Sequence, residues 1–212
     1  VEVAYIDGKY IDNEEYESHS YFEENCLVNS TADIEKEDKS YKYIGSATEC
    51  ALLLYHNSKD YIQFRKYTKL LSQVPFSSDK KRMSSLIDID GNEIFLSKGA
   101  PEVLLEKCEY IQKGRDIVLI TPKIRAEVLK EIGKLQDKSM RILGFAYKIV
   151  DTWAKEIALT CDSELAISEY LETYENDEDL IFSGFVGIVD PLREGVKESI
   201  QIAYDAGVKV KM

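Results

Sequence analysis

The sequence predicts an α+β fold in which an antiparallel β-sheet is flanked by helices. First, two strand-like segments are joined by Asp90-Gly91-Asn92, a tripeptide typical of a tight hairpin between antiparallel strands. Second, two segments that begin at a proline carry a single apolar stripe at helical spacing. Third, the order strand, helix, glycine, strand around Asp190 predicts a short α/β piece at the C-terminal end.

Composition restricts the possible functions of the chain. Its 212 residues are 44% hydrophobic, which suits one globular domain with part of a second attached. Acidic residues outnumber basic ones by 39 to 27, and the net charge of −12 argues against nucleic acid or an anionic membrane as a general partner. No apolar stretch approaches the roughly 20 residues that cross a bilayer. The start, Val1-Glu2-Val3, has no initiator Met, so we expect a fragment of a longer protein.

The four cysteines are far apart and have no histidine companions. No C-x-x-C pair occurs, so they are interpreted as reduced cytosolic thiols, and no metal site is expected. Paired carboxylates and a Ser-His-Asp order are not evident either, so no catalytic residue is predicted within this chain.

The first forty residues combine short apolar pieces with many carboxylates. We therefore expect an acidic, mobile, solvated insert at about residues 23–40. Ser46-Ala47-Thr48-Glu49 then matches a capping box, with Ser46 as the N-cap and Glu49 three positions later. The helix that follows is predicted to continue, or to rejoin, through Leu71.

The middle of the chain alternates between strands and helices. A second helix should begin at Pro101 and a third at Thr121-Pro122, where the threonine caps and the proline takes the first helical position. The apolar stripe of the second helix is formed by Val103, Leu104, Cys108 and Ile111. The predicted strands are Val74–Phe76, Met83–Asp88, Glu93–Ser97, Arg141–Ile149 and Leu180–Val189.

The pattern changes at Asp190. Gly184 and Gly187 in the preceding strand indicate close approach by another backbone. Asp190-Pro191 ends that strand and caps a helix through Ala206, before a glycine and a short strand at Val208–Val210. We therefore predict two domains, residues 1–189 and residues 190–212, the second being the start of a parallel α/β domain.

Two segments have the residue types of a nucleotide site. In Lys98-Gly99-Ala100-Pro101-Glu102 a lysine at a strand end precedes a glycine, which lets backbone approach a ligand, and then a helix N-terminus. The alternative is a plain helix start with an exposed lysine. In the segment 76–83, Phe76 can stack on a purine and Lys81 lies among the cations that follow. The alternative for Phe76 is a core position.

Two further residues have a functional and a structural interpretation. Glu49 can accept a hydrogen bond from an adenine amino group, or it can simply close the capping box. Arg141 can pair with phosphate through its planar guanidinium, or it can be a solvated or salt-bridged side chain at a strand start.

Five blocks in order resemble the nucleotide-binding domain of P-type cation-transporting ATPases. The resemblance implies that Phe76 stacks on adenine and Glu49 meets the adenine edge. It also implies that Lys81, Lys98, with the adjacent Gly99, and Arg141 line the pocket or contact phosphates. The blocks are A-T-E-C-A-L (47–52), F-S-S-D-K-K-R-M-S (76–84), K-G-A-P-E (98–102), M-R-I-L-G-F-A-Y (140–147) and D-P-L-R (190–193).

The last block identifies the predicted boundary. Asp190 and Arg193 match the D-P-x-R segment, where the family's chain returns to the haloacid-dehalogenase-like phosphorylation domain and bends as the domains close. Asp190 can alternatively be only an N-cap. The family's D-K-T-G-T and T-G-D blocks are missing, so this chain is expected to bind ATP with Mg²⁺ without hydrolysing it. The protein ligands of that Mg²⁺ are expected outside it.

Details of the blocks resemble the plasma-membrane-type calcium pumps most. These are T-E-C-A-L-L, Ser78 and the ending A-G-V-K-V-K-M. The resemblance implies Ca²⁺ transport by the intact pump, with the phosphorylation and actuator domains as partners. It also implies a monomeric domain at the cytosolic face of a plasma or vacuolar membrane, without direct membrane contact. Sarcoplasmic-type pumps often have an arginine at Ser78, so weaker nucleotide binding is expected here.

Two other function classes remain open from the sequence. The first is a non-enzymatic interaction module that kept the fold and lost nucleotide binding, its acidic insert recruiting a basic partner. The second is a soluble phosphatase or hydrolase related to the α/β piece after Asp190. That class needs a nucleophilic aspartate at a strand end, and none is evident.

Overall fold

The computed structural model describes residues 1–11, 21–37, 40–56, 60–150, 171, 173–174, 176, 178–189 and 195–211. Its helices are α1 (Phe22–Leu27), α2 (Ala47–Tyr55), α3 (Tyr61–Tyr67), α4 (Pro101–Glu106), α5 (Pro122–Gln136) and α8 (Val196–Asp205). Its strands are β1 (Val3–Ile6), β2 (Lys9–Ile11), β3 (Asp33–Glu37), β4 (Ser40–Ile44), β5 (Lys69–Ser77), β6 (Arg82–Ile89), β7 (Asn92–Gly99), β8 (Cys108–Lys113), β9 (Asp116–Leu119), β10 (Arg141–Ile149) and β11 (Leu180–Ile188).

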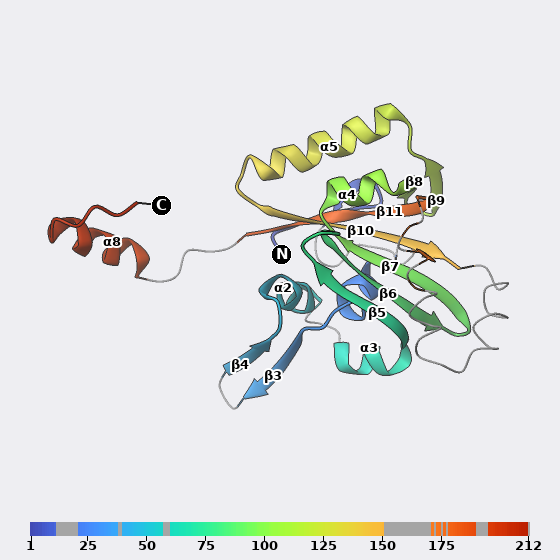
Figure 1. Cartoon of the computed structure of the whole chain (residues 1–212), viewed down its shortest axis with the longest axis horizontal. Helices are drawn as coiled ribbons and strands as arrows, with labels where there is room; N and C mark the ends of the chain where they lie inside the picture. The colour runs from blue at the N-terminus through green and yellow to red at the C-terminus, as the bar shows by residue number, and fades with distance from the viewer. Residues whose placement is uncertain are drawn as a thin grey trace.

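One large sheet organises the described part of the chain (Figure 1). Its strands follow the order β2-β1-β11-β10-β7-β6-β5, and β8 and β9 extend it beyond β11. The pairs are antiparallel except β8 with β11, which is parallel. Strands β3 and β4 form a separate antiparallel hairpin. The predicted α+β class with an antiparallel sheet flanked by helices is confirmed.

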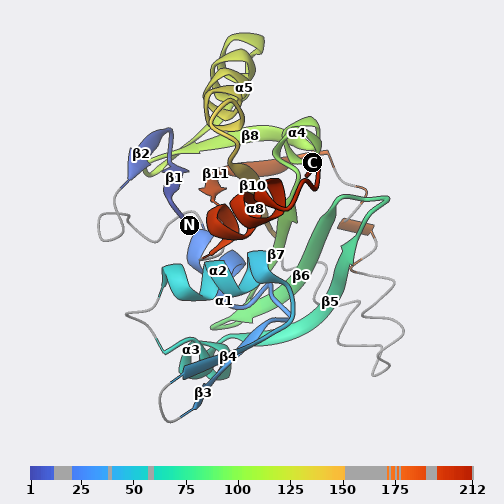
Figure 2. The same cartoon turned by 90° about the vertical axis from the view of Figure 1, so that its left-hand side faces the viewer.

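Helices cover both faces of the sheet, as Figures 1 and 2 show from two directions. Helices α1 and α2 bury their apolar residues on one face, and α4 and α5 bury theirs on the other. The alternation along each strand explains this division, because successive side chains of a strand point to opposite faces. In β7, Ile94 and Leu96 belong to the core under α1 and α2, whereas Phe95 belongs to the core under α4 and α5.

The beginning of the chain differs from the expectation of a mobile insert at about residues 23–40. Strand β1 pairs with β11, and α1 is buried, with Cys26 and Leu27 fully covered. Phe22 and Cys26 stand one helical turn apart and face the core. The carboxylates between them conceal this short apolar stripe in the sequence. The expectation of a solvated loop is therefore wrong for residues 23–30, and residues 33–37 form a strand instead of a loop.

Two predicted helix ends are also wrong. The helix expected to reach Leu71 ends at Tyr67, because residue 69 begins β5, which pairs with β6. The second helix ends at Glu106, and Cys108 and Ile111 are buried in strand β8 instead. Residues three apart point to opposite faces of a regular strand, but the pairing of β8 with β11 shifts register between Leu180 and Ile181, and Cys108 and Ile111 both reach the same core.

The C-terminal end is only partly as predicted. Helix α8 ends at Asp205, close to the expected Ala206, but residues 208–210 form no strand. Val208 is exposed, and a lone strand has no partner to satisfy its backbone groups. The boundary between residues 189 and 190 stays a prediction.

Two local predictions are confirmed, one at the turn between β6 and β7 and one at the start of α5. Asp90 and Gly91 both have positive φ in the turn between β6 and β7, as a two-residue hairpin requires. The Thr121 hydroxyl accepts a hydrogen bond from the Ile124 amide at the start of α5.

No helix within the described ranges is long and apolar enough to cross a membrane. Three cysteines, Cys26, Cys50 and Cys108, are buried free thiols, and Cys161 lies outside the described residues.

Gly184 provides a test of the packing between β1 and β11. Its φ is +148°, and a Cβ there would lie 2.1 Å from the Tyr5 carbonyl oxygen. We expect Gly184→Ala to lower the free energy of unfolding by about 3 kcal/mol, because backbone must move to relieve the overlap. Urea unfolding measures it. Gly133→Ala in α5 is the control, since its Cβ meets nothing within 4 Å and should be neutral or stabilising. Equal effects of the two changes would contradict the close approach.

Candidate functional site

A pocket of about 480 Å³ opens at one end of the sheet. Its size falls within the range of small-molecule and cofactor sites. Six of the eight residues predicted for a site are in its wall. The wall is formed by Ser46, Thr48, Glu49, Phe76, Lys81, Met83, Lys98, Gly99, Ala100, Arg141, Ile142 and Leu143. The other two predicted residues, Asp190 and Arg193, lie outside the described residues.

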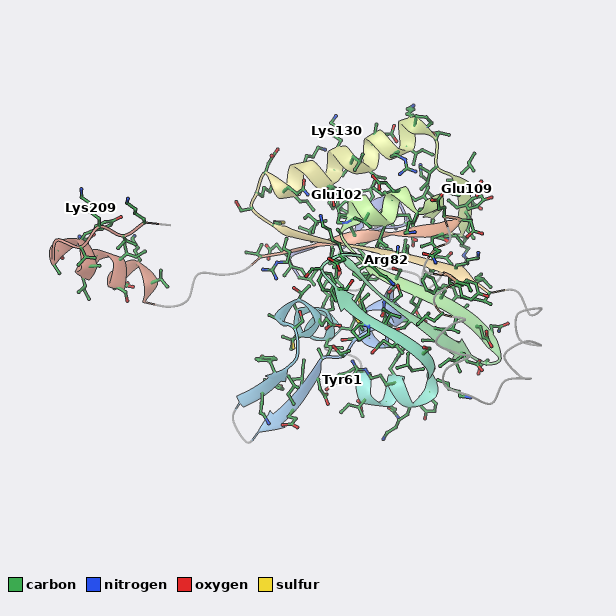
Figure 3. All side chains as sticks on the ribbon, viewed as in Figure 1. Tyr61, Arg82, Glu102, Glu109, Lys130 and Lys209 are labelled. Carbon is green, nitrogen blue, oxygen red and sulfur yellow. The ribbon has the colours of Figure 1, made fainter. Side chains whose placement is uncertain are left out.

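The sheet register explains why residues far apart in sequence meet here. Strand β7 is paired with β6 on one side and β10 on the other. Lys98 is opposite Met83 in β6 and opposite Phe145 in β10. The end of β7, the turn before β6 and the start of β10 therefore reach the same edge, and Figure 3 labels Arg82 at this convergence.

Gly99 is required by the packing of this edge. A Cβ on Gly99 would lie 2.3 Å from the Lys81 carbonyl oxygen and 2.7 Å from Arg82 Cα. The same carbonyl accepts a hydrogen bond from the Ala100 amide at 2.9 Å. The backbone that approaches Gly99 is thus that of the neighbouring turn, whereas the sequence suggested approach to a ligand. Gly99 therefore allows the turn between β5 and β6, called the lysine-bearing turn because it carries Lys81, to pack against β7.

Lys98 and Glu49 form a buried ion pair in the pocket wall. Lys98 Nζ donates to Glu49 Oε1 at 3.0 Å, and their side chains are only 4% and 12% exposed. The Glu49 carboxylate also accepts from Thr31, through its amide at Oε1 and its hydroxyl at Oε2, both at 3.2 Å. The carboxylate is thus directed to Lys98 and Thr31, and the capping-box interpretation of Glu49 is wrong.

Burial and the charge of the partner both shift the pKa values of Glu49 and Lys98. Burial by itself would raise the Glu49 pKa, but the Lys98 charge and hydrogen bonds from Lys98, Thr31 and Ser30 bring it below its ordinary value. Burial lowers the pKa of Lys98, and the Glu49 charge opposes that change. The pair therefore places a cation in the pocket wall, and the Glu49 carboxylate balances the charge of that cation.

Phe76 and Lys81 belong to the turn region between β5 and β6. Phe76 is 60% exposed although it is aromatic, so the core alternative for it is wrong. Lys81 has positive φ and closes the turn through its amide, which donates to the Ser77 carbonyl at 2.8 Å. An exposed ring and an exposed ammonium therefore share one side of the pocket.

Arg141 comes from the other side of the pocket, at the start of β10. Its Nη1 donates to the Thr48 hydroxyl at 3.0 Å, which ties it to the first turn of α2. A guanidinium has five N–H donors in a planar fork suited to phosphate or carboxylate oxygens. The bond to Thr48 fixes the position of this fork at the pocket wall.

Sequence reasoning missed several lining residues. Thr48, Met83, Ile142 and Leu143 all lie inside the blocks quoted above, and membership of a block was their only signal. Thr31 had no signal, because its partner Glu49 is 18 positions away. Among the described residues, no group of three or more His, Cys, Asp or Glu could hold a metal ion.

The wall as a whole fits a planar aromatic ligand with an anionic tail. It combines an exposed ring and apolar side chains with two lysines and an arginine. Phe76 can stack on a base, and the three cations can meet phosphate oxygens. Glu49 supplies a hydrogen-bond acceptor, although in this structure its oxygens are engaged by Thr31 and Lys98.

Comparison with known proteins places the chain in a family. Residues 17–195 match the model for the P-type ATPase cytoplasmic domain N. The calcium-transporting ATPase PAT1 of Dictyostelium discoideum is 34% identical over 174 residues, 81% of this chain and 14% of that protein. Calcium-transporting ATPase 1 of Lactococcus lactis is 30% identical over 80% of this chain and 18% of that protein. The plasma membrane-type calcium-transporting ATPase 5 of rice is 31% identical, over 79% and 15% respectively. The chain thus spans less than a fifth of these relatives.

The buried ion pair predicts a pH-dependent stability. We expect Glu49→Gln to lower the free energy of unfolding at pH 7 by about 3 kcal/mol, because Lys98 keeps a buried charge without its partner. The folded pKa of Glu49 is below its ordinary 4.5, so its contribution is present above that pH and is lost as the pH falls through the folded value. The gap between wild type and variant should therefore narrow in acid, as measured by urea unfolding at several pH values.

The exposed pair of Glu35 and Lys42 is the control for this measurement. It has a similar distance, 2.8 Å, but both side chains are more than half exposed. Glu35→Gln should leave the stability unchanged at every pH, because solvent screens such a pair. A constant gap between wild type and Glu49→Gln across the acid range would contradict the assigned role of Glu49.

Proposed function

Because the chain belongs to the family of P-type ATPase cytoplasmic N domains, we propose that its pocket binds ATP. The observation that carries the proposal is the exposed Phe76 ring, which shares a pocket with Lys81, Lys98 and Arg141. Three cations around one opening are notable in a chain of net charge −12. An exposed ring beside them supplies a stacking surface for a base.

ATP would bind with its base and phosphates at different parts of the wall. Adenine stacks on Phe76, and its amino group donates to Glu49, which requires the carboxylate to share its oxygens with Lys98. The triphosphate meets Lys81, Lys98 and the Arg141 fork. Mg²⁺ arrives with ATP as part of the substrate. We assign its protein ligands, and the phosphorylated aspartate, to other parts of the pump.

The proposal extends to the protein that carries this chain. The relatives reported above are calcium-transporting ATPases by name. We propose that the whole protein is an ATP-hydrolysing Ca²⁺ pump of a plasma or vacuolar membrane, with this monomeric domain on the cytosolic side. The domain delivers ATP to the phosphorylation domain, and the actuator domain is the second partner. Positioning of the phosphate then provides most of the rate enhancement.

Asp190 and Arg193 belong to the proposed return segment. Residues 1–189 would form the nucleotide domain, and residues 190–212 would begin the phosphorylation domain. Closure of the two domains over the nucleotide would bend the chain at this segment.

Removing the Phe76 ring tests the proposed nucleotide site. We expect the chain to bind ATP more tightly than GTP, because guanine has a carbonyl where adenine donates its amino group. Phe76→Ala should weaken ATP binding about tenfold, the size of one lost base–aromatic stack. Isothermal calorimetry with and without Mg²⁺ measures both effects.

Tyr67→Ala is the matched control for the aromatic change. Tyr67 is 80% exposed and is not part of the pocket wall, so its removal should not change the affinity. No ATP binding by the folded wild-type chain would overturn the proposal and favour an interaction module of the same fold.

The transport proposal is tested on the whole protein in membrane vesicles. We expect ATP-dependent uptake of radioactive Ca²⁺ that Lys98→Ala lowers at least about tenfold, because a phosphate contact and the partner of Glu49 are lost together. Lys66→Ala, an exposed lysine on α3, should leave uptake unchanged. Uptake of another cation instead of Ca²⁺ would overturn the assigned ion.

A further inference from the structure

The turn Asn29–Thr31 joins α1 to β3 and contacts two walls of the pocket. Asn29 is fully buried and binds to strand β6. Its amide nitrogen donates to the Met83 carbonyl at 3.4 Å, and its amide oxygen accepts from the Ser85 hydroxyl at 2.7 Å. It also donates to Asn25 within α1 at 2.9 Å. The start of the turn is thereby fixed to the sheet.

Arg65 fixes the same segment from the other side. Its Nε donates to the Leu27 carbonyl at 2.7 Å and its Nη2 to the Ala32 carbonyl at 3.0 Å. These carbonyls lie on either side of the turn. Arg65 belongs to α3, and the guanidinium also stands 5.0 Å from the centre of the Tyr61 ring, which Figure 3 labels on that helix. The turn is therefore held between β6 and α3, with little freedom to shift.

Thr31 uses this fixed position to hold a carboxylate of the pocket. Its amide donates to Glu49 Oε1 and its hydroxyl to Glu49 Oε2, so both oxygens are bound by one residue. Glu49 Oε1 in turn accepts from Lys98 Nζ. Two donors from a rigid turn determine the plane of the carboxylate, which then determines where the ammonium of Lys98 lies.

We propose that Thr31 is a positioning residue for nucleotide binding, which acts through Glu49 on Lys98. The proposal rests on the proposed function of the pocket. An ammonium has three N–H donors, and a carboxylate fixed by Thr31 engages one of them, which leaves others for a phosphate. Without the Thr31 hydroxyl the carboxylate is no longer held in one plane, and the ammonium of Lys98 that it positions is less well placed for the phosphate. Thr31 itself touches no reacting atom.

Most titratable groups packed around Glu49 keep one charge state in acid. Burial raises the pKa of the Cys26 and Cys50 thiols, so both stay neutral there. Lys98 and Arg65 stay protonated at acid pH, although burial lowers the pKa of each. Asp33 also titrates in acid, and the hydrogen bond from Tyr61 lowers its pKa, so the titration of Glu49 has to be followed on glutamate carboxyls alone.

Two substitutions at Thr31 separate the hydroxyl from the shape of the side chain. Thr31→Val removes the hydroxyl and keeps the branched shape and the backbone amide, whereas Thr31→Ser keeps the hydroxyl. Isotope-edited NMR of the Glu side-chain carboxyls follows Glu49 directly, and calorimetry gives the affinity for ATP. We expect Thr31→Val to raise the Glu49 pKa and to weaken ATP binding about fivefold, less than the loss of a direct hydrogen bond to a charged group because Thr31 acts through Glu49. Thr31→Ser should stay within about twofold of wild type.

A double variant tests whether Thr31 acts through Glu49. In the Glu49→Gln background, Thr31→Val should change ATP affinity by less than about twofold, because coupled residues are not additive. Additive losses, equal losses in Thr31→Ser and Thr31→Val, or an unchanged Glu49 pKa in Thr31→Val would each overturn the inference. If Thr31→Val does not fold, Thr31→Ala takes its place in the same comparisons.

The two readouts keep this inference distinct from the proposed function. If wild type binds no ATP, the proposed function fails, and with it the role of Thr31 in nucleotide binding. The Glu49 titration then still decides whether Thr31 positions the carboxylate. If wild type binds ATP but Thr31→Val binds equally well, only the positioning role fails.

Discussion

The packing of β7 between β6 and β10 is the constraint on which the rest of the structure depends. At Gly99 the neighbouring backbone comes so close that a Cβ would lie 2.3 Å from a carbonyl oxygen, and at Gly144 in β10 a Cβ would lie 2.8 Å from Pro101 Cα. Side chains cannot be accommodated at either point, so the strands and α4 approach to backbone contact. That approach brings the lysine-bearing turn and Lys98 to one edge, and it aligns both cores along the sheet.

The pocket puts a costly interaction at the end of this rigid sheet. Burying Lys98 removes an ammonium from water, and its attraction to Glu49 offsets this only when further hydrogen bonds satisfy the carboxylate. Thr31 supplies two of them. An apolar pair of the same shape would avoid the desolvation and would serve stability equally well. The buried ion pair at the pocket wall therefore adds little stability that an apolar pair could not provide.

Residue patterns predicted the fold class and six lining residues of the site, because both depend on local signals. The hairpin at residues 90–92 and the cap at Thr121 are set by neighbouring residues. An irregular strand can bring residues three apart to one core, as a helix does, so Cys108 and Ile111 misled the assignment of β8. The place of α1 depends on Asn25, whose amide donates to the Ala146 carbonyl far along the chain. Such long-range contacts have no periodic signature in a single sequence.

The polar contacts beneath the pocket connect it to the β3–β4 hairpin. Thr31 lies two residues before β3, and the amide of Ile34 in that strand donates to the Tyr61 hydroxyl at 2.9 Å. Arg65, one turn along the same helix, holds the residues on both sides of the turn. Coupling between two sites is reciprocal. If the fixed turn positions Lys98 for a phosphate, then a phosphate bound at Lys98 must stabilise the turn by the same free energy. The start of β3 closely follows the turn and would be stabilised with it.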